Sequence, residues 1–148
     1  TEDRVTFYRA TTKRHTAQSE FDLGDLKTLP KVDILYSYVQ PNPATIPALV
    51  ASGTIGLVFA GTGAGGISDA ERGALNKLKE DAKVKVKPVV VVRSARVGSG
   101  RVIRTNSDKE NGTVAGDSIQ PQKARILLML ALTKTQDIAE IQRMFLEY

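Results

Sequence analysis

Two apolar runs constrain this chain most, because each of them fits only the interior of a sheet. Residues 55–63 (IGLVFAGTG) and 87–98 (KPVVVVRSARVG) carry few polar side chains, which is typical of strands covered on both faces. A helical pattern at 68–83 separates them, and its Ser68 and Glu71 form an S-x-x-E capping box. Strand, helix and strand in this order predict a parallel pair joined by a right-handed crossover.

The same alternation of strand and helix patterns extends over the rest of the chain. We expect a strand or hairpin arm at 4–11, an irregular connector at 12–30, a strand at 31–39, a helix at 42–53, a long loop at 99–118, and helices at 121–135 and 136–148. A chain of 148 residues suits one domain. The predicted fold class is therefore α/β: a small three-layer domain with a mainly parallel, flavodoxin-like sheet, preceded by the strand or hairpin and the connector.

The charge and composition of the chain narrow the classes of partner. A formal net charge of +5 would suit nucleic acid, but the densest basic run, residues 77–87, is interrupted by Glu80 and Asp81 and contains no aromatic residue on which a base could stack. No apolar run reaches the roughly 18 residues of a membrane span. The chain has no cysteine for disulfides or thiolate metal sites. We expect no nucleic-acid or membrane partner, no metal and no cofactor.

The glycine-rich segment after the second predicted strand admits two interpretations. Gly61, Gly63 and Gly66 fit G-x-G-x-x-G, the pattern of a dinucleotide-binding turn. That class needs an acid for the ribose at the end of the next strand, where this chain has Arg93, which could instead serve a 2′-phosphate. The other interpretation is a tight connection that lets helix 68–83 pack on its strand. Residues 63–66 are all glycine or alanine, and backbone with so little side chain indicates close approach to another group.

Five segments together resemble one known family. They are KRHTAQSEFDL (13–23), LPKVDILYSY (29–38), FAGTGAGGIS (59–68), VVVVRSARVGSG (89–100) and the closing PQKARILLMLALTKTQDIAEIQRMFLEY (121–148). In this order they are similar to the C-terminal part of bacterial type II L-asparaginases, and in particular of the glutaminase-asparaginases. The resemblance covers essentially the whole chain.

This resemblance implies a domain organisation and an activity. Residues 1–30 would be a strand and an interdomain connector, and residues 31–148 the C-terminal α/β domain of an amidohydrolase acting on L-asparagine and L-glutamine. The threonine nucleophile and its activating partners belong to the family's N-terminal domain, whose motifs are absent from this sequence, so the chain alone is expected to be inactive. Since it starts at Thr1, we expect that a preceding part was removed or left out. The resemblance also implies a homodimer or homotetramer, contact with its own N-terminal domain, and a periplasmic or secreted location.

The resemblance further implies that this domain completes a neighbouring subunit's substrate site. Gly65 and Gly66 are the candidate positions in the glycine loop, although Gly66 stands where the family usually has Asn or Ser. The family's glutamate falls in RTNSDKENG (104–112), where counting reaches Ser107, while Asp108 and Glu110 supply the carboxylate that a substrate ammonium requires.

Two further expectations concern residues outside that site. His15, the only histidine, lies in the polar connector without a neighbouring nucleophile and buried acid, so we expect a surface residue and no catalytic base. The alternative function is a free-standing module of the same fold that binds an anion or amino acid through the loop amides.

Overall fold

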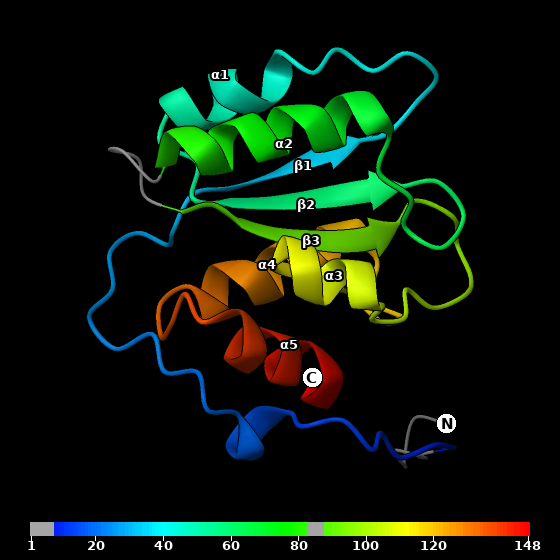
Figure 1. Cartoon of the computed structure of the whole chain (residues 1–148). Helices are drawn as coiled ribbons and strands as arrows, with labels where there is room; N and C mark the ends of the chain where they lie inside the picture. Colours follow the sequence, from blue (N-terminus) through cyan, green and yellow to red (C-terminus); the bar gives the residue numbers. More distant parts are fainter. Residues whose placement is uncertain (1–7, 83–87) are drawn as a thin grey trace, which may run out of the picture.

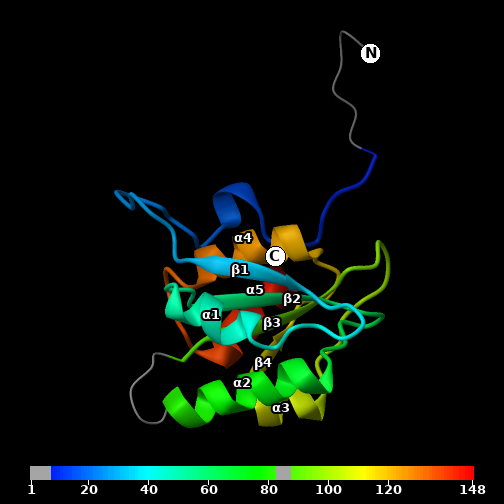
Figure 2. The same ribbon diagram turned by 90° about the horizontal axis from the view of Figure 1, so that it is seen from above.

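A computed structural model describes residues 8–82 and 88–148, which form a parallel sheet between two layers of helices. The strands are β1 (Val32–Tyr36), β2 (Gly56–Gly61), β3 (Val90–Ala95) and β4 (Thr113–Ala115). The helices are α1 (Thr45–Ala51), α2 (Asp69–Ala82), α3 (Asn106–Asn111), α4 (Pro121–Ala131) and α5 (Ile138–Glu147), after a short 3-10 turn at Thr16–Gln18. Helices α1 and α2 cover one face, and α4 and α5 the other (Figures 1 and 2). The predicted three-layer α/β class is confirmed.

The alternation of side chains along β2 divides the interior into two cores. Leu57 and Phe59 pack under α1 and α2, whereas Val58 packs against α4 and α5. All residues of β2 are buried, as the apolar run predicted for a strand covered on both faces. The Ser68–Glu71 capping box is also confirmed, because Glu71 N donates to Ser68 Oγ while Ser68 N donates to the Glu71 carboxylate.

The four strands lie in sequence order, β1-β2-β3-β4, and every pair is parallel. A flavodoxin sheet instead reverses its order after the first strand. Because the order is sequential and all pairs are parallel, the carboxyl ends of β1, β2 and β3 meet at one edge of the sheet. The glycine loop and the segments that follow β1 and β3 gather there.

The segment 99–118 is not the continuous loop that its composition predicts, because it contains α3 and β4. Thr105 and Asp108 form a capping box that begins α3, and Gly112, with φ 58°, ends it. The three-residue β4 is completed by α5, where the Gln142 side chain donates to Ala115 O and accepts from Ala115 N. A partner so distant in sequence leaves no local signal.

Other expectations differ at their ends or lie outside the described residues. No strand occurs at residues 8–11, and residues 4–7 of that predicted arm lie outside the described part. Residues 83–87 also lie outside it, and they include the end of the predicted helix 68–83, the start of the predicted strand 87–98 and part of the basic run 77–87. Helix α1 (Thr45–Ala51) is shorter than the predicted 42–53 at both ends. It begins after Pro43, and it ends before Gly53, whose φ is 94°.

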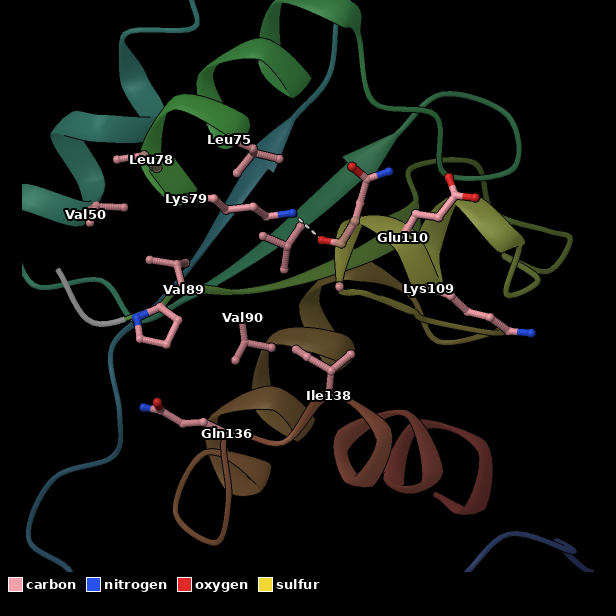
Figure 3. A pocket seen from close by; sticks show the side chains of 14 residues that line it. Val50, Leu75, Leu78, Lys79, Val89, Val90, Lys109, Glu110, Gln136 and Ile138 are labelled. Carbon is pink, nitrogen blue, oxygen red and sulfur yellow. Dashed lines mark hydrogen bonds between the residues drawn. The ribbon is translucent and has the colours of Figure 1, made fainter. Parts of the chain in front are cut away.

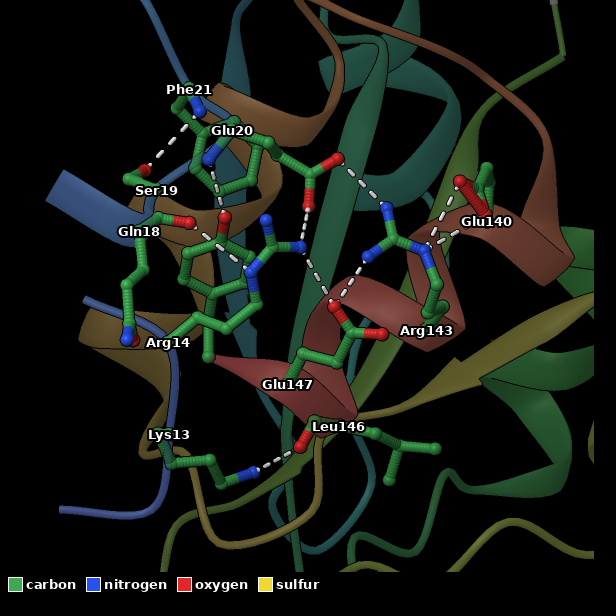
Figure 4. A network of polar contacts seen from close by, with 11 residues as sticks. Lys13, Arg14, Gln18, Ser19, Glu20, Phe21, Glu140, Arg143, Leu146 and Glu147 are labelled. Carbon is green, nitrogen blue, oxygen red and sulfur yellow. Dashed lines mark hydrogen bonds and ion pairs between the residues drawn. The ribbon is translucent and has the colours of Figure 1, made fainter. Parts of the chain in front are cut away.

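The first part of the connector, residues 12–21, lies along α5, at the far side of the molecule from α1 and α2, and the rest leads up to β1 (Figure 1). A network of ion pairs attaches it: Arg14 bonds Glu147 at 2.9 Å and Glu20 at 3.1 Å, and Arg143 bonds Glu20 at 2.8 Å (Figure 4). The Tyr148 hydroxyl accepts a bond from Glu20 N at 2.7 Å. The connector is thereby fixed to the last helix of the chain.

Candidate functional site

The glycine loop turns tightly at the carboxyl end of β2, and Gly61 makes this turn possible. A Cβ at Gly61 would lie 2.5 Å from both Gly65 C and Gly66 O, closer than side chains approach backbone. The loop closes through a bond from Gly66 N to Thr62 O at 2.8 Å. Gly61 therefore serves the fold of the loop itself, whereas the second interpretation placed the close approach between helix 68–83 and its strand.

The two candidate site glycines differ in environment. Gly65 is buried with φ 76°, and a Cβ there would lie 2.9 Å from a Val102 methyl group. Gly66 is exposed and has no positive φ, and a Cβ there would meet only Thr62, at 3.2 Å from Oγ1. Gly65 thus shapes the loop from inside, whereas Gly66 is the position from which a side chain could reach a ligand.

The same region is poorly suited to a pyrophosphate. The first turn of α2 carries Asp69 and Glu71, and the buried Glu71 carboxylate already accepts bonds from Ser68 N at 3.0 Å and Ser68 Oγ at 2.7 Å. Negative charge at a helix N-terminus repels an anion there. Gly66 N–H is also used within the loop, which argues against the anion-binding module as well. The dinucleotide interpretation is disfavoured.

Arg93, in the middle of β3, joins the glycine loop to α3. Its guanidinium forms a bidentate pair with Asp108, at 2.6 Å from Nε to Oδ1 and 2.7 Å from Nη2 to Oδ2. Its Nη1 donates to Ala64 O and Gly65 O, at 3.3 and 3.2 Å. Arg93 is therefore committed to the protein's own groups and does not point to a 2′-phosphate.

The Asp108 carboxylate is buried and occupied on both oxygens. Besides Arg93, it accepts bonds from Thr113 Oγ1 at 2.7 Å, Thr105 N at 2.7 Å and Thr105 Oγ1 at 2.8 Å. Burial alone would raise the pKa of Asp108, but the bonds from Arg93, Thr113 and Thr105 outweigh it and hold this pKa well below its usual range. Asp108 is therefore an ionised carboxylate with a structural role, and at 2 % exposure it is not accessible to a ligand.

Glu110 lies elsewhere, on the rim of a groove of about 560 Å³ (Figure 3). The groove is apolar and runs between α2, the start of β3 and the start of α5, lined by Leu75, Leu78, Val89 and Ile138 among others. The exposed Glu110 side chain is directed away from these apolar groups (Figure 3). The structure thus joins Gly65 to Asp108 through Arg93, whereas no hydrogen bond among the described residues links Glu110 to the glycine loop.

Residues 8–82 and 88–148 hold no complete catalytic group of the hydrolytic type. His15 is exposed, and within the described residues its ring has one hydrogen-bond partner, the hydroxyl of the adjacent Thr16, at 3.1 Å from Nδ1. Ser37 Oγ donates to the Glu71 carboxylate, at 3.3 and 3.2 Å, but both side chains are buried and no histidine or lysine bonds them. Within the same residues, no cluster of His, Cys, Asp or Glu could hold a metal, and no helix is long and apolar enough to cross a membrane.

Comparison with known proteins gives consistent results. A family model for the glutaminase/asparaginase C-terminal domain matches residues 31–145. L-asparaginase 2 of Bacillus subtilis (strain 168) is 45% identical over 147 residues, which are 99% of this chain and 37% of that protein. Glutaminase-asparaginase of Pseudomonas fluorescens biotype A is 41% identical over 151 residues, 99% of this chain and 40% of the relative.

A solved structure agrees with these sequences. The probable cytoplasmic L-asparaginase of Campylobacter jejuni superposes with a TM-score of 0.90 at 42% identity, over 100% of this chain and 47% of that one. The chain spans less than half the length of each of these three proteins. Their names disagree about location, because another relative, from Haemophilus influenzae, is called periplasmic. The chain belongs to the family of glutaminase/asparaginase C-terminal domains.

Proposed function

We propose that this chain is the C-terminal domain of an amidohydrolase that converts L-asparagine, and L-glutamine as a second substrate, to the acid and ammonia. In the net reaction one water is consumed, the C–N bond of the side-chain amide breaks, the carbon becomes a carboxylate, and the nitrogen leaves as ammonia after gaining a proton. The observation that carries this proposal is the family match over residues 31–145 together with relatives named as asparaginases and glutaminase-asparaginases. In this proposal, residues 1–30 connect to an N-terminal domain that supplies the nucleophile.

For this chain's own residues we propose a supporting role at a neighbouring subunit's site. Gly66 presents its exposed backbone to the amino end of the substrate, and Gly65 gives the loop its course. In the segment 104–112, Asp108 orders the backbone, and Glu110, whose carboxylate is exposed, offers the negative charge that an ammonium needs. Such a site requires more than one copy of the protein, so we propose a homodimer or homotetramer, which light scattering of the whole protein tests.

The experiment for the proposed function is a hybrid enzyme. The C-terminal stretch of the Bacillus subtilis L-asparaginase 2 that aligns with this chain is replaced by residues 1–148, and ammonia release from L-asparagine is measured. We expect activity from the hybrid and none from residues 1–148 alone, since the described residues show no nucleophile with a partner base. A folded but inactive hybrid, or turnover by the isolated chain that depends on one of its own residues, contradicts the proposal.

We further propose a location outside the cytoplasm, as the name of the Haemophilus influenzae relative has it. Cell fractionation of the source organism, with a periplasmic and a cytoplasmic marker followed in parallel, tests this. Recovery of the protein with the cytoplasmic marker would place it with the Campylobacter jejuni protein instead.

A further inference from the structure

The side chain of Arg93 connects the two segments that the proposed function assigns to the substrate site. We infer that Arg93 is a positioning residue for this site: it fixes the glycine loop relative to the first turn of α3, so that Gly66 is held where a substrate can meet it. This inference rests on the proposed function. Arg93 itself would not touch the substrate, because its guanidinium is turned toward the protein's own groups.

The hydrogen bonds of Arg93 use its whole donor capacity. A guanidinium has five N–H groups in a fixed plane. Nε and one Nη2 hydrogen serve Asp108, the other Nη2 hydrogen serves Ile103 O at 3.2 Å, and the two Nη1 hydrogens serve Ala64 O and Gly65 O. One planar group therefore ties together three separate segments: the backbone of the glycine loop, the backbone before α3, and the Asp108 side chain of α3.

Asp108 carries this link into the start of α3. Its Oδ2 accepts bonds from Thr105 N and Thr105 Oγ1, while its own backbone N–H donates to Thr105 Oγ1 at 3.3 Å. The capping box thus fixes the direction of α3, and the ion pair fixes the box to β3. The helix has only six residues and could not hold this direction on its own.

The glycine loop needs such an anchor more than most loops do. Gly63, Ala64 and Gly66 are exposed, and glycine backbone has the largest conformational freedom of any residue. The carbonyls that Arg93 binds belong to Ala64 and Gly65, the two residues directly before Gly66. Lysine could not replace this fork, because an ammonium has three donors that radiate from a single nitrogen.

The experiment compares variants of the hybrid enzyme described above. Arg93→Lys keeps the charge but loses the planar fork, so the glycine loop is no longer held in place. We expect KM for L-asparagine to rise about tenfold, as for the loss of one hydrogen bond between the loop and the charged substrate, with kcat changed by less than about twofold. Asp108→Asn, which keeps the shape of the side chain, should give the same split. Arg143→Ala is the matched control: it removes an arginine with several ion pairs far from the loop, and should lower Tm without changing KM.

The outcomes separate the inference from the proposed function. A parent hybrid without activity contradicts the proposed function. An active parent in which Arg93→Lys leaves KM unchanged, or alters KM and kcat together in step with Tm, contradicts the inference alone. If neither Arg93→Lys nor Asp108→Asn folds, the pair serves stability only and the inference is wrong.

Discussion

Gly65 and Gly66 are adjacent, yet a side chain should be accepted at only one of them. Gly65→Ser places a β-carbon at φ 76° and against Val102, so we expect unfolding free energy to fall by about 1–3 kcal/mol. Gly66→Ser meets only the flexible Thr62 hydroxyl closely and should cost less than about 0.5 kcal/mol. Denaturant unfolding of both variants measures this difference. Equal losses would show that the loop has a different course.

The same Gly66 variants also test the substrate site. In the hybrid enzyme, Gly66→Ser and Gly66→Asn restore a polar side chain, and we expect KM for L-asparagine to fall about tenfold through one new bond to a charged group. Gly73→Ser, on the exposed side of α2 where a Cβ meets no neighbour, is the control and should leave KM unchanged. An unchanged KM in a Gly66 variant that melts like the parent means that this position does not face the substrate.

Asp108 gives a prediction about pH. Its pKa is depressed in the folded state, so the stabilisation is fully present above the unfolded-state pKa, about 3.9, and is lost as pH falls toward the folded-state value. We expect Asp108→Asn to lower the unfolding free energy by about 3 kcal/mol at pH 7, because Arg93 loses its buried partner. This difference should shrink below about pH 4. A difference that stays constant down to pH 2.5 would contradict the ion pair.

At the scale of elements, β4 depends on one side chain of α5. Gln142→Leu leaves both Ala115 N–H and Ala115 C=O without their partner, and two buried groups at about 1–3 kcal/mol each predict a loss of about 2–6 kcal/mol. Gln122→Leu is the matched control, since Gln122 is exposed and its one side-chain bond within the described part of the chain is to Tyr36 Oη, at 3.1 Å. Thermal unfolding distinguishes them, and equal melting temperatures would show that Gln142 does not support the strand.

The elements that the sequence predicted are those with a local signal. Strands β2 and β3 follow from apolar runs, and α2 follows from its capping box and its apolar periodicity. The sequence failed at α3 and β4, because a T-x-x-D box among turn-forming residues is a weak signal and β4 is completed by Gln142, 27 residues away. Local composition cannot show a partner supplied by another helix.

The candidate site shows the same limit at finer detail. The family resemblance pointed to Gly66 and the segment 104–112, which stay predictions, but it could not decide the direction of a carboxylate. Asp108 and Glu110 are two residues apart, which on a helix places them about 200° apart, so one faces β3 and the other solvent. Arg93 also carries a signal in the sequence, which the dinucleotide interpretation relates only to a 2′-phosphate. A charged residue inside a buried apolar strand needs a partner of opposite charge, and the structure supplies Asp108.

For the whole molecule, the attachment of the connector to α5 predicts where local opening starts. Arg143→Ala removes bonds to Glu20, Glu140 and Glu147, so we expect hydrogen exchange to become faster at residues 13–21 through local opening. Exchange in buried β2 should rise only by the smaller factor that follows from the change in global unfolding free energy. Higher salt should have a similar effect on the parent. Lys77→Ala, on exposed α2, serves as the control. Unchanged exchange at 13–21 would contradict this attachment.

The pairing of Arg14 with Glu147 has a consequence for biosynthesis. The two residues are 133 positions apart, so at ribosomal rates the arginine waits on the order of ten seconds before its glutamate is made. During that time β1, β2 and β3 can already pair, because their crossovers are short, while the connector remains exposed to chaperones and proteases. The connector could therefore dock only after the last turn of α5 has been synthesised.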